Sequence, residues 1–247
     1  KRARPALPRY PRHPLPELVI VVVHLLRLLA LTVFLFTLLG CVRMLALQAP
    51  SVYELPYRTW EIGLIAPHYM EVWVESVDVV DSRGFAYERV HGGTSSVTNP
   101  SGNRGNPSGW SERPGAGKTR PMTGIDLPDH IFVRWQSLAE PQTYNVRIDI
   151  PTWARIEMLA LQKVVCRFNG KSIQDYRKVV TVGLAPGGIA KVWLNGDCAD
   201  PLEVGRFEGV VDPNGPYGGT SGGEYYRPPS EHAQHYLDTH DIPFQSW

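Results

Sequence analysis

The stretch from Glu231 to Asp241 carries the densest set of side chains that could do chemistry. His232 and His235 are three residues apart, so on a helix they would share a face and could bind a metal ion with Asp238 or His240. A terminal stretch of this composition more often forms a solvated helix. We therefore expect no metal ion and no other cofactor.

A second candidate set consists of two histidines that flank a long polar segment. His91 and His130 could each pair with Asp126 or Asp129, as the base and its orienting acid do in a hydrolase triad. No serine lies in the G-x-S-x-G pattern that places a nucleophile on a sharp turn. We therefore predict that the protein is not an enzyme.

The segment Gly115–Thr119 is similar to the end of a phosphate-binding loop. The first glycine of that motif would fall at Glu112, and no apolar strand leads into the segment. Nucleotide binding is therefore disfavoured. A formal net charge of +1, with 20% charged residues, also gives no indication of a nucleic-acid partner.

The N-terminal region contains an apolar stretch from Leu18 to Leu39, in which His24 and Arg27 are the ionisable residues. In a transmembrane helix, Arg27 would lie near the bilayer centre, at a cost of about 2.5–3.5 kcal/mol. In a signal peptide, Arg27 belongs to the basic leading region and Leu28–Leu39 forms the apolar core. A signal peptide therefore accounts for the charge of Arg27 better than a transmembrane helix does.

The apolar stretch ends in Leu38-Leu39-Gly40-Cys41, which resembles the lipobox of bacterial lipoproteins. That resemblance implies cleavage before Cys41 and acylation of its thiol. There are two alternatives. The stretch could be an uncleaved membrane anchor, or the native start codon could lie downstream of the first residue of this sequence. In lipoproteins generally an Asp after the cysteine favours the inner membrane, and Val42 stands there. We expect acyl chains to anchor the protein to the periplasmic face of the outer membrane.

With Cys41 acylated, Cys166 and Cys198 remain as a pair in an oxidising compartment. We predict a disulfide between them, with two buried thiols as the alternative. Their separation and the absence of a C-x-x-C pattern give little support to a metal or redox site.

The domain organisation follows from these segments: a signal segment over residues 1–41, a linker over 42–56 and one β-rich domain over 57–247. The 23 glycines and 22 prolines suit short strands joined by turns. Strands are predicted near residues 71–79, 131–135, 143–150, 164–168, 178–184, 189–194 and 202–211. The second and third, and the fifth and sixth, are expected to form hairpins.

Two helices and one long loop complete the prediction. Residues 153–162, with Ile156 and Leu159 at helical spacing and Thr152 as cap, suggest an interior helix. Residues 230–239 suggest a short C-terminal helix, and residues 91–123 a long mobile loop. The predicted class is α+β, mainly β, with an antiparallel sheet or sandwich.

Five side chains are candidates for binding a protein partner. Trp110 and Arg113 lie in the predicted loop, and Tyr217, Tyr225 and Tyr226 lie in a glycine-rich tail. Aromatic residues and arginine are enriched in the hot spots of interfaces. The alternative is that the aromatic rings fasten these segments to the sheet.

Several segments together resemble a known family of proteobacterial lipoproteins, domain of unknown function family 2931. They are Leu127–Pro128, Val133–Leu138, Arg147–Pro151, Gly183–Leu194 and Gly215–Gly219. The resemblance implies no established catalytic activity. It implies instead that the chain shares a role of some members as periplasmic immunity proteins, encoded beside type VI secretion lipase effectors. No functional residue can be carried over from the family.

Our hypothesis is therefore a lipid-anchored immunity protein that neutralises a toxin, possessing no enzymatic activity of its own. The cognate effector would be a phospholipase, blocked when the segment Val90–Thr123 enters its cleft, with Tyr217–Tyr226 as a second candidate segment for this contact. The alternative is a housekeeping outer-membrane lipoprotein that binds a glycan or assists envelope assembly.

Overall fold

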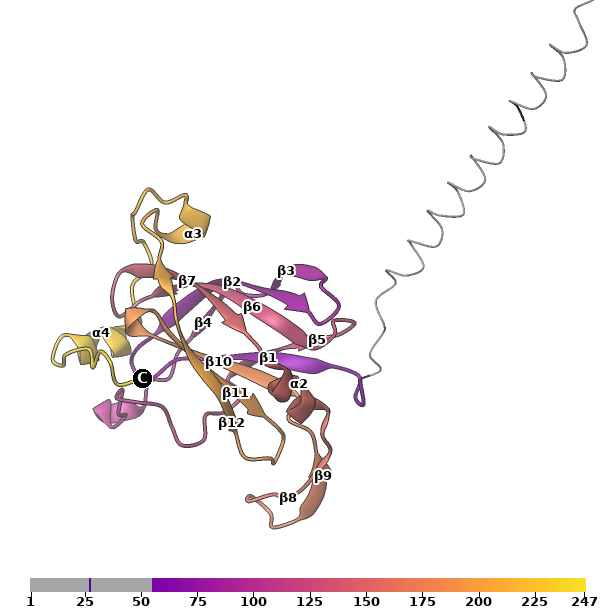
Figure 1. Cartoon of the computed structure of the whole chain (residues 1–247). Coiled ribbons are helices and arrows are strands. Elements are labelled where there is room, and N and C mark those ends of the chain that lie inside the picture. The colour runs from indigo at the N-terminus through magenta and orange to yellow at the C-terminus, as the bar shows by residue number, and fades with distance from the viewer. Residues whose placement is uncertain (1–26, 28–54) are drawn as a thin grey trace, which may run out of the picture. The chain divides into compact units, whose positions relative to one another are not determined.

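Two β-sheets form the framework of the folded chain (Figure 1). The computed structural model describes Arg27 and residues 55–247. The rest of the predicted signal segment, Cys41 and most of the predicted linker lie outside the described residues. In the described part of the chain, no helix is long and apolar enough to cross a membrane.

Sheet A has the strand order β12-β11-β10-β1-β5. In that order its strands are Leu202–Glu208, Ile189–Asn195, Val179–Ala185, Trp60–Ile65 and Lys118–Met122. β1 and β10 pair in parallel, and the other three pairs of this sheet are antiparallel. The predicted hairpin of β10 and β11 is confirmed.

Sheet B has the order β13-β7-β6-β2-β3, with β4 also paired to β2. These strands are β13 (Val210–Val211), β7 (Gln142–Asp149), β6 (Pro128–Ser137), β2 (Val72–Asp81), β3 (Ala86–His91) and β4 (Thr94–Ser96). All pairs in this sheet are antiparallel. The predicted hairpin of β6 and β7 is confirmed, and so is the mainly β fold class.

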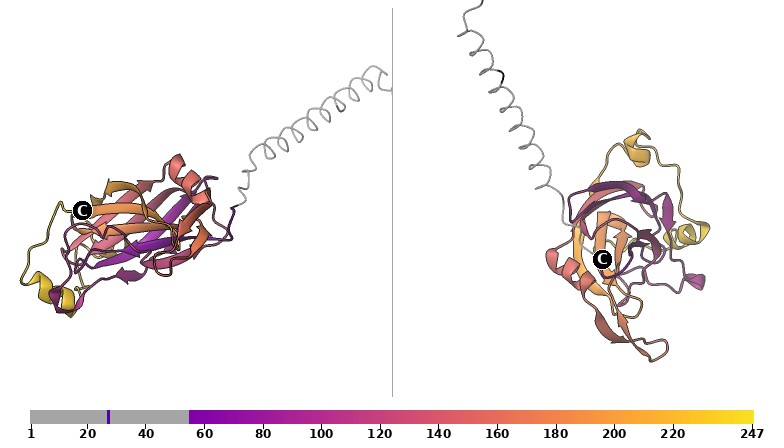
Figure 2. Two further views of the ribbon diagram at one scale, coloured as in Figure 1. Left: turned by 90° about the horizontal axis from the view of Figure 1, so that it is seen from below. Right: turned by 90° about the vertical axis from the view of Figure 1, so that its right-hand side faces the viewer.

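The hydrophobic core lies between the two sheets (Figure 2). Trp60, Ile62 and Leu64 of β1 are fully buried there, as are Ile131 and Trp135 of β6. Alternate residues of each strand point into this core, because side chains along a strand alternate between its faces.

The outer face of sheet A is covered by the chain itself. A Cβ on Gly63 would come within 1.8 Å of the Ala116 carbonyl oxygen, and one on Gly183 within 2.6 Å of the Trp110 ring. β10 is therefore buried on both faces, which explains its seven consecutive buried residues. The range predicted as one mobile loop, residues 91–123, contains β4, the short 3-10 turn η1 (Ser101–Asn103) and β5.

The tight turn between β10 and β11 is η2 (Pro186–Gly188). Gly188 has φ 77°, and a Cβ there would lie 2.8 Å from the Tyr144 ring. The backbone N–H of Gly187 donates to Glu140 at 2.6 Å. Glycine is thus required at Gly188 both by backbone conformation and by the close approach of β7.

Helix α2 (Thr152–Leu159) differs from the predicted interior helix. Its buried residues are Ala154 and Met158, whereas Ile156 is 61% exposed. The N-cap residue is Pro151, and no side chain caps the helix. Leu159 packs against the core as predicted, whereas the predicted burial of Ile156 and the Thr152 cap are wrong.

Helix α4 (Glu231–Leu237) is capped by Ser230, whose hydroxyl accepts a hydrogen bond from the Ala233 N–H at 3.3 Å. This C-terminal helix is confirmed. Figures 1 and 2 show α2 and α4 at opposite ends of the sandwich.

Strands β8 (Gln162–Val165) and β9 (Ser172–Asp175) form a separate two-stranded sheet. The predicted disulfide joins Cys166 to Cys198, with the Cα atoms 4.9 Å apart. Asp175 accepts hydrogen bonds from the N–H groups of Cys198 and Ala199 at 2.7 and 2.9 Å. The hairpin is thus fastened at two points to the β11–β12 connection, which offsets the low stability of a two-stranded sheet.

Candidate functional site

A β-bulge in β2 prepares the outer face of sheet B. Val72, Val74, Val77 and Val79 are all fully buried, although the step from residue 74 to 77 breaks the two-residue period. The register with β6 shifts at this step, between Val74 and Ser76. Glu75 is the extra residue of this bulge, without a partner in the β6 register, and its side chain lies on the same outer face as that of Trp73.

The Glu75 carboxylate accepts four hydrogen bonds. The donors are Arg134 Nε at 2.7 Å, Gln136 Nε2 at 2.6 Å, and the N–H groups of Tyr217 at 2.7 Å and Gly218 at 3.0 Å. Burial works to raise the pKa of Glu75, but these hydrogen bonds outweigh burial and hold the pKa below its usual range. Glu75 is therefore a charged anchor rather than a general base.

Arg134 connects Glu75 to the glycine-rich tail, which we define as residues 212–230. Its guanidinium donates to the carboxylate of Asp212 and to the carbonyl oxygen of Gly215. This contact lowers the pKa of Asp212. Burial works to lower the pKa of Arg134, but its two acidic partners raise it overall. The three charges therefore remain ionised and fix the first residues of the tail.

The tail adopts a backbone conformation that only this anchor explains. Tyr217 and Gly218, in the single turn α3 (Pro216–Gly219), have φ 58° and 68°. A left-handed conformation costs a residue with a side chain about 1–2 kcal/mol. The two successive N–H groups both point at Glu75, forming a small anion-binding concavity that the carboxylate fills.

The rest of the tail follows the same strand face. The Arg227 guanidinium lies 3.4 Å from the centroid of the Trp73 ring. Glu71, buried just before β2, accepts hydrogen bonds from the N–H and hydroxyl of Ser230 at 2.7 and 2.6 Å. Positions 71, 73 and 75 share one face of the strand, so the tail runs along it to α4.

The tail exposes two aromatic rings, and a groove on the same sheet shares Arg134 with the anchor of the tail. Tyr217 is 44% and Tyr226 68% exposed, and their rings stack with centroids 6.5 Å apart. The groove, of about 420 Å³, is lined by Phe132, Arg134 and Val210, among others. Exposed tyrosines, an arginine and apolar side chains are the composition of protein-binding hot spots.

The family model described as "Protein of unknown function (DUF2931)" matches residues 46–245. The chain belongs to this family. No curated protein and no solved structure matches it. The matched range of the DUF2931 chain includes both sheets and the whole tail, so the groove and the tyrosine pair are parts of the family domain.

The structure separates the five predicted binding residues of the DUF2931 chain into two groups. Trp110 packs edge-on against Trp193, with ring centroids 5.2 Å apart, on the outer face of sheet A. Arg113 forms an ion pair with Asp200 at 3.4 Å. Tyr217 and Tyr226 lie together on sheet B, with the half-buried Tyr225 beside them in the chain.

The histidines considered for catalysis have structural partners. His91 Nε2 lies 2.9 Å from the Lys118 carbonyl oxygen, and its Nδ1 accepts from the Gly92 N–H at 2.8 Å. Burial lowers the pKa of His91, so the ring is neutral. His130 lies 3.1 Å from Asp129, and the His240 ring stacks on Tyr236 at 4.0 Å. Within residues 55–247, no three His, Cys, Asp or Glu side chains group closely enough to hold one metal ion.

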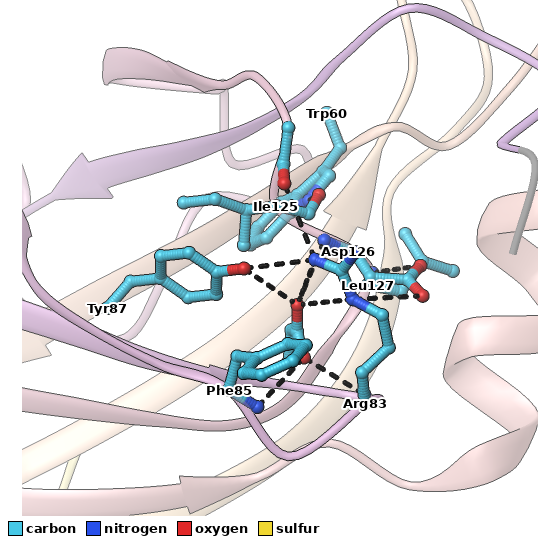
Figure 3. A network of polar contacts seen from close by, with 9 residues as sticks. Trp60, Arg83, Phe85, Tyr87, Ile125, Asp126 and Leu127 are labelled. Carbon is cyan, nitrogen blue, oxygen red and sulfur yellow. Dashed lines mark hydrogen bonds and ion pairs between the residues drawn. The ribbon is translucent and has the colours of Figure 1, made fainter. Parts of the chain in front are cut away.

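A buried acidic cluster around Asp81 also fixes structure (Figure 3). Asp81 accepts from Arg83 Nε at 2.9 Å, from the Phe85 N–H at 3.2 Å and from the Tyr87 hydroxyl at 3.3 Å. Burial works to raise the pKa of Asp81, but the hydrogen bonds from Arg83 and Phe85 lower it overall. Arg83 also lies 3.9 Å from Asp126, so the cluster joins the β2–β3 turn to the segment before β6.

Sequence reasoning missed Glu75, Arg134 and Asp212, the three charges that shape the site. One signal was present, because the apolar positions 72, 74, 77 and 79 change phase at Glu75. Such a change within a strand indicates a bulge and marks the polar residue that it re-aims.

Proposed function

We propose that this DUF2931 protein is a lipid-anchored envelope protein that binds a protein partner through the groove and the tyrosine pair, and is not an enzyme. The observation that carries the proposal is Tyr217, held in a left-handed conformation by Glu75 while its ring remains 44% exposed. Strain of this kind is retained mainly at functional sites. A ring that is already fixed loses little entropy on binding.

The proposed partner is a toxin, a lipase effector of type VI secretion, whose active site the protein would occlude. The family resemblance supplies this partner class, and the exposed tyrosines beside an arginine-lined groove suit a protein surface. Two segments are candidates for occlusion, Val90–Thr123 and Tyr217–Tyr226. Because Trp110 packs on sheet A, the tail is the better candidate for this role.

The test is capture of the proteins encoded by neighbouring genes on the purified, tagged full chain, followed by an assay of lipase activity. Hot-spot residues contribute about 2 kcal/mol or more each. The double variant Tyr217→Ala/Tyr226→Ala should therefore weaken capture and inhibition by roughly 100-fold or more. Phe244→Ala, which removes another exposed ring (51%), is the matched control. Unchanged inhibition by a folded double variant would reject this surface.

A glycan-binding envelope protein is the second candidate, favoured by a hollow of about 380 Å³ lined by His68, Asn106, Ser108 and Trp110. Two buried polar atoms, Trp110 Nε1 and His68 Nδ1, have no hydrogen-bond partner among the described residues. Such atoms favour a polar ligand. Titration with cell-wall glycan fragments tests it, and Trp110→Phe should abolish any binding that uses the indole N–H.

A further inference from the structure

Helix α2 and the β8–β9 hairpin concentrate exposed apolar side chains, and we call this region the apolar end. Thirteen large hydrophobic side chains are exposed in the described residues, and five of them lie between positions 153 and 168. They are Trp153 (44%), Ile156 (61%), Leu161 (49%), Val165 (61%) and Phe168 (80%). Single exposed apolar residues need no explanation, but five within the sixteen positions 153–168 make this segment a candidate contact surface.

The same region carries exposed cations. Lys163, Arg167 and Lys171 lie between or beside the apolar residues, and all three are exposed. Two nearby acids are already engaged: Asp200 pairs with Arg167 at 3.4 Å, and Glu157 is contacted by Arg177 at 3.4 Å and by Gln162 at 2.9 Å. Basic and apolar side chains together fit an anionic lipid surface, where each cation near the headgroups contributes about 1 kcal/mol.

The apolar end lies where the described chain enters the domain. Leu55 shares a hollow of about 230 Å³ with Arg155, Ile156 and Leu159 of α2. In the sequence, Leu55 comes fourteen positions after Cys41 and sixteen after the end of the apolar stretch at Leu39. Fourteen residues span at most roughly 50 Å, so an anchor at Cys41, as proposed above, would limit how far Leu55 can lie from the membrane.

We infer that the apolar end rests on the surface of the membrane that holds the N-terminal anchor. Trp153 would lie at the interface, where tryptophan is enriched, and the hairpin cations would lie among anionic headgroups. The disulfide Cys166–Cys198 holds the hairpin tip in place for this contact. The inference rests on the lipid-anchored placement proposed above, but it requires no protein partner and no tyrosine pair.

Quenching of tryptophan fluorescence tests this contact on the full chain reconstituted into vesicles of phosphatidylethanolamine and phosphatidylglycerol. All seven tryptophans lie at or after position 60, so the anchor adds no signal. Among these seven tryptophans, Trp153 alone has a side chain that is more than a third exposed. Vesicles with brominated acyl chains should quench part of the emission, and Trp153→Phe should abolish that part.

Two further variants separate the lipid contact from other effects. Phe168→Ser should reduce the quenching of Trp153, whereas Phe244→Ser, at another exposed phenylalanine near the C-terminus (51%), should leave it unchanged. Flotation of the vesicles reports anchoring independently. A chain that floats with equal emission in brominated and ordinary vesicles would overturn the contact and leave the proposed binding function standing. A chain that does not float would overturn both the contact and the anchored placement.

Discussion

Replacing Glu75 with glutamine is the most direct perturbation of the candidate site. The substitution keeps the shape of the side chain, but it replaces one acceptor oxygen with an NH2 group that faces former donors. Of the four donors at 2.6–3.0 Å, about half lose their acceptor. Hydrogen bonds to a charged group contribute about 1.5–3 kcal/mol each.

Arg134 limits the loss, because it keeps its contacts with Asp212 and Gly215. We therefore expect Glu75→Gln to lower the free energy of unfolding by about 2–4 kcal/mol, less than removal of a fully isolated buried partner would cost. The strain at Tyr217, about 1–2 kcal/mol, is then no longer offset. Tyr217 and Gly218 should then leave their left-handed conformation.

Urea unfolding measures the first effect, and hydrogen exchange of the tail measures the second. The matched control is Glu208→Gln, at an acid whose side chain is 74% exposed, which should change stability by less than about 0.5 kcal/mol. Because the pKa of Glu75 is lowered in the folded state, its contribution is present above the unfolded pKa of about 4.3 and is lost as pH falls through the folded pKa. The acid-induced loss of stability below about pH 4 should therefore be smaller in the variant. Unchanged unfolding and unchanged exchange of the tail would refute our account of the anchor.

Three other predictions test the rest of the molecule. Gly183→Ala should displace Trp110, whose ring lies 2.6 Å from the added Cβ, at a cost of about 1–3 kcal/mol visible as a shift in tryptophan emission; an unchanged spectrum would contradict the packing. The pKa of His91 is lowered by burial, so its contribution is present above the unfolded value of about 6.5 and is lost as pH falls through the folded pKa. His91→Gln should remove this dependence, measured by denaturation between pH 7 and 5. The double variant Cys166→Ser/Cys198→Ser should lose about 3–4 kcal/mol and the exchange protection of residues 162–175, and protection that persists would show that Asp175 alone secures the hairpin.

The strands that could be predicted are those whose own apolar pattern shows which of their faces are buried. The pattern of Val72–Asp81 indicates one buried face, and the continuous apolar run of β10 indicates burial on both. The parallel pairing of β1 with β10 was not predicted, because it joins residues more than 110 positions apart and leaves no local signal. Helix α2 shows a related limit, because helical spacing of Ile156 and Leu159 reveals an apolar face without revealing what covers it.

Only the exposed residues of the candidate site could be predicted from the sequence. Tyrosines in a glycine-rich tail are recognisable by type, so Tyr217 and Tyr226 were identified from the sequence. The charged residues that hold the tail could not be identified in this way, because Arg134 contacts Glu75 across 59 positions and Asp212 across 78 positions of the sequence. Contacts between such distant charges depend on the register of the sheet, which the sequence pattern does not determine.

The two proposed surfaces are compatible in one orientation of the domain. The tail ends at α4, and α2 lies at the opposite end of the sandwich. If the apolar end contacts the membrane, the tail leads away from it, and the groove on sheet B remains open to a protein arriving from the aqueous side. A partner that acts on lipid would meet the domain within the roughly 50 Å that the linker allows. The membrane contact would then restrict the orientation of the groove, and restricted orientation lowers the entropy lost when a partner binds.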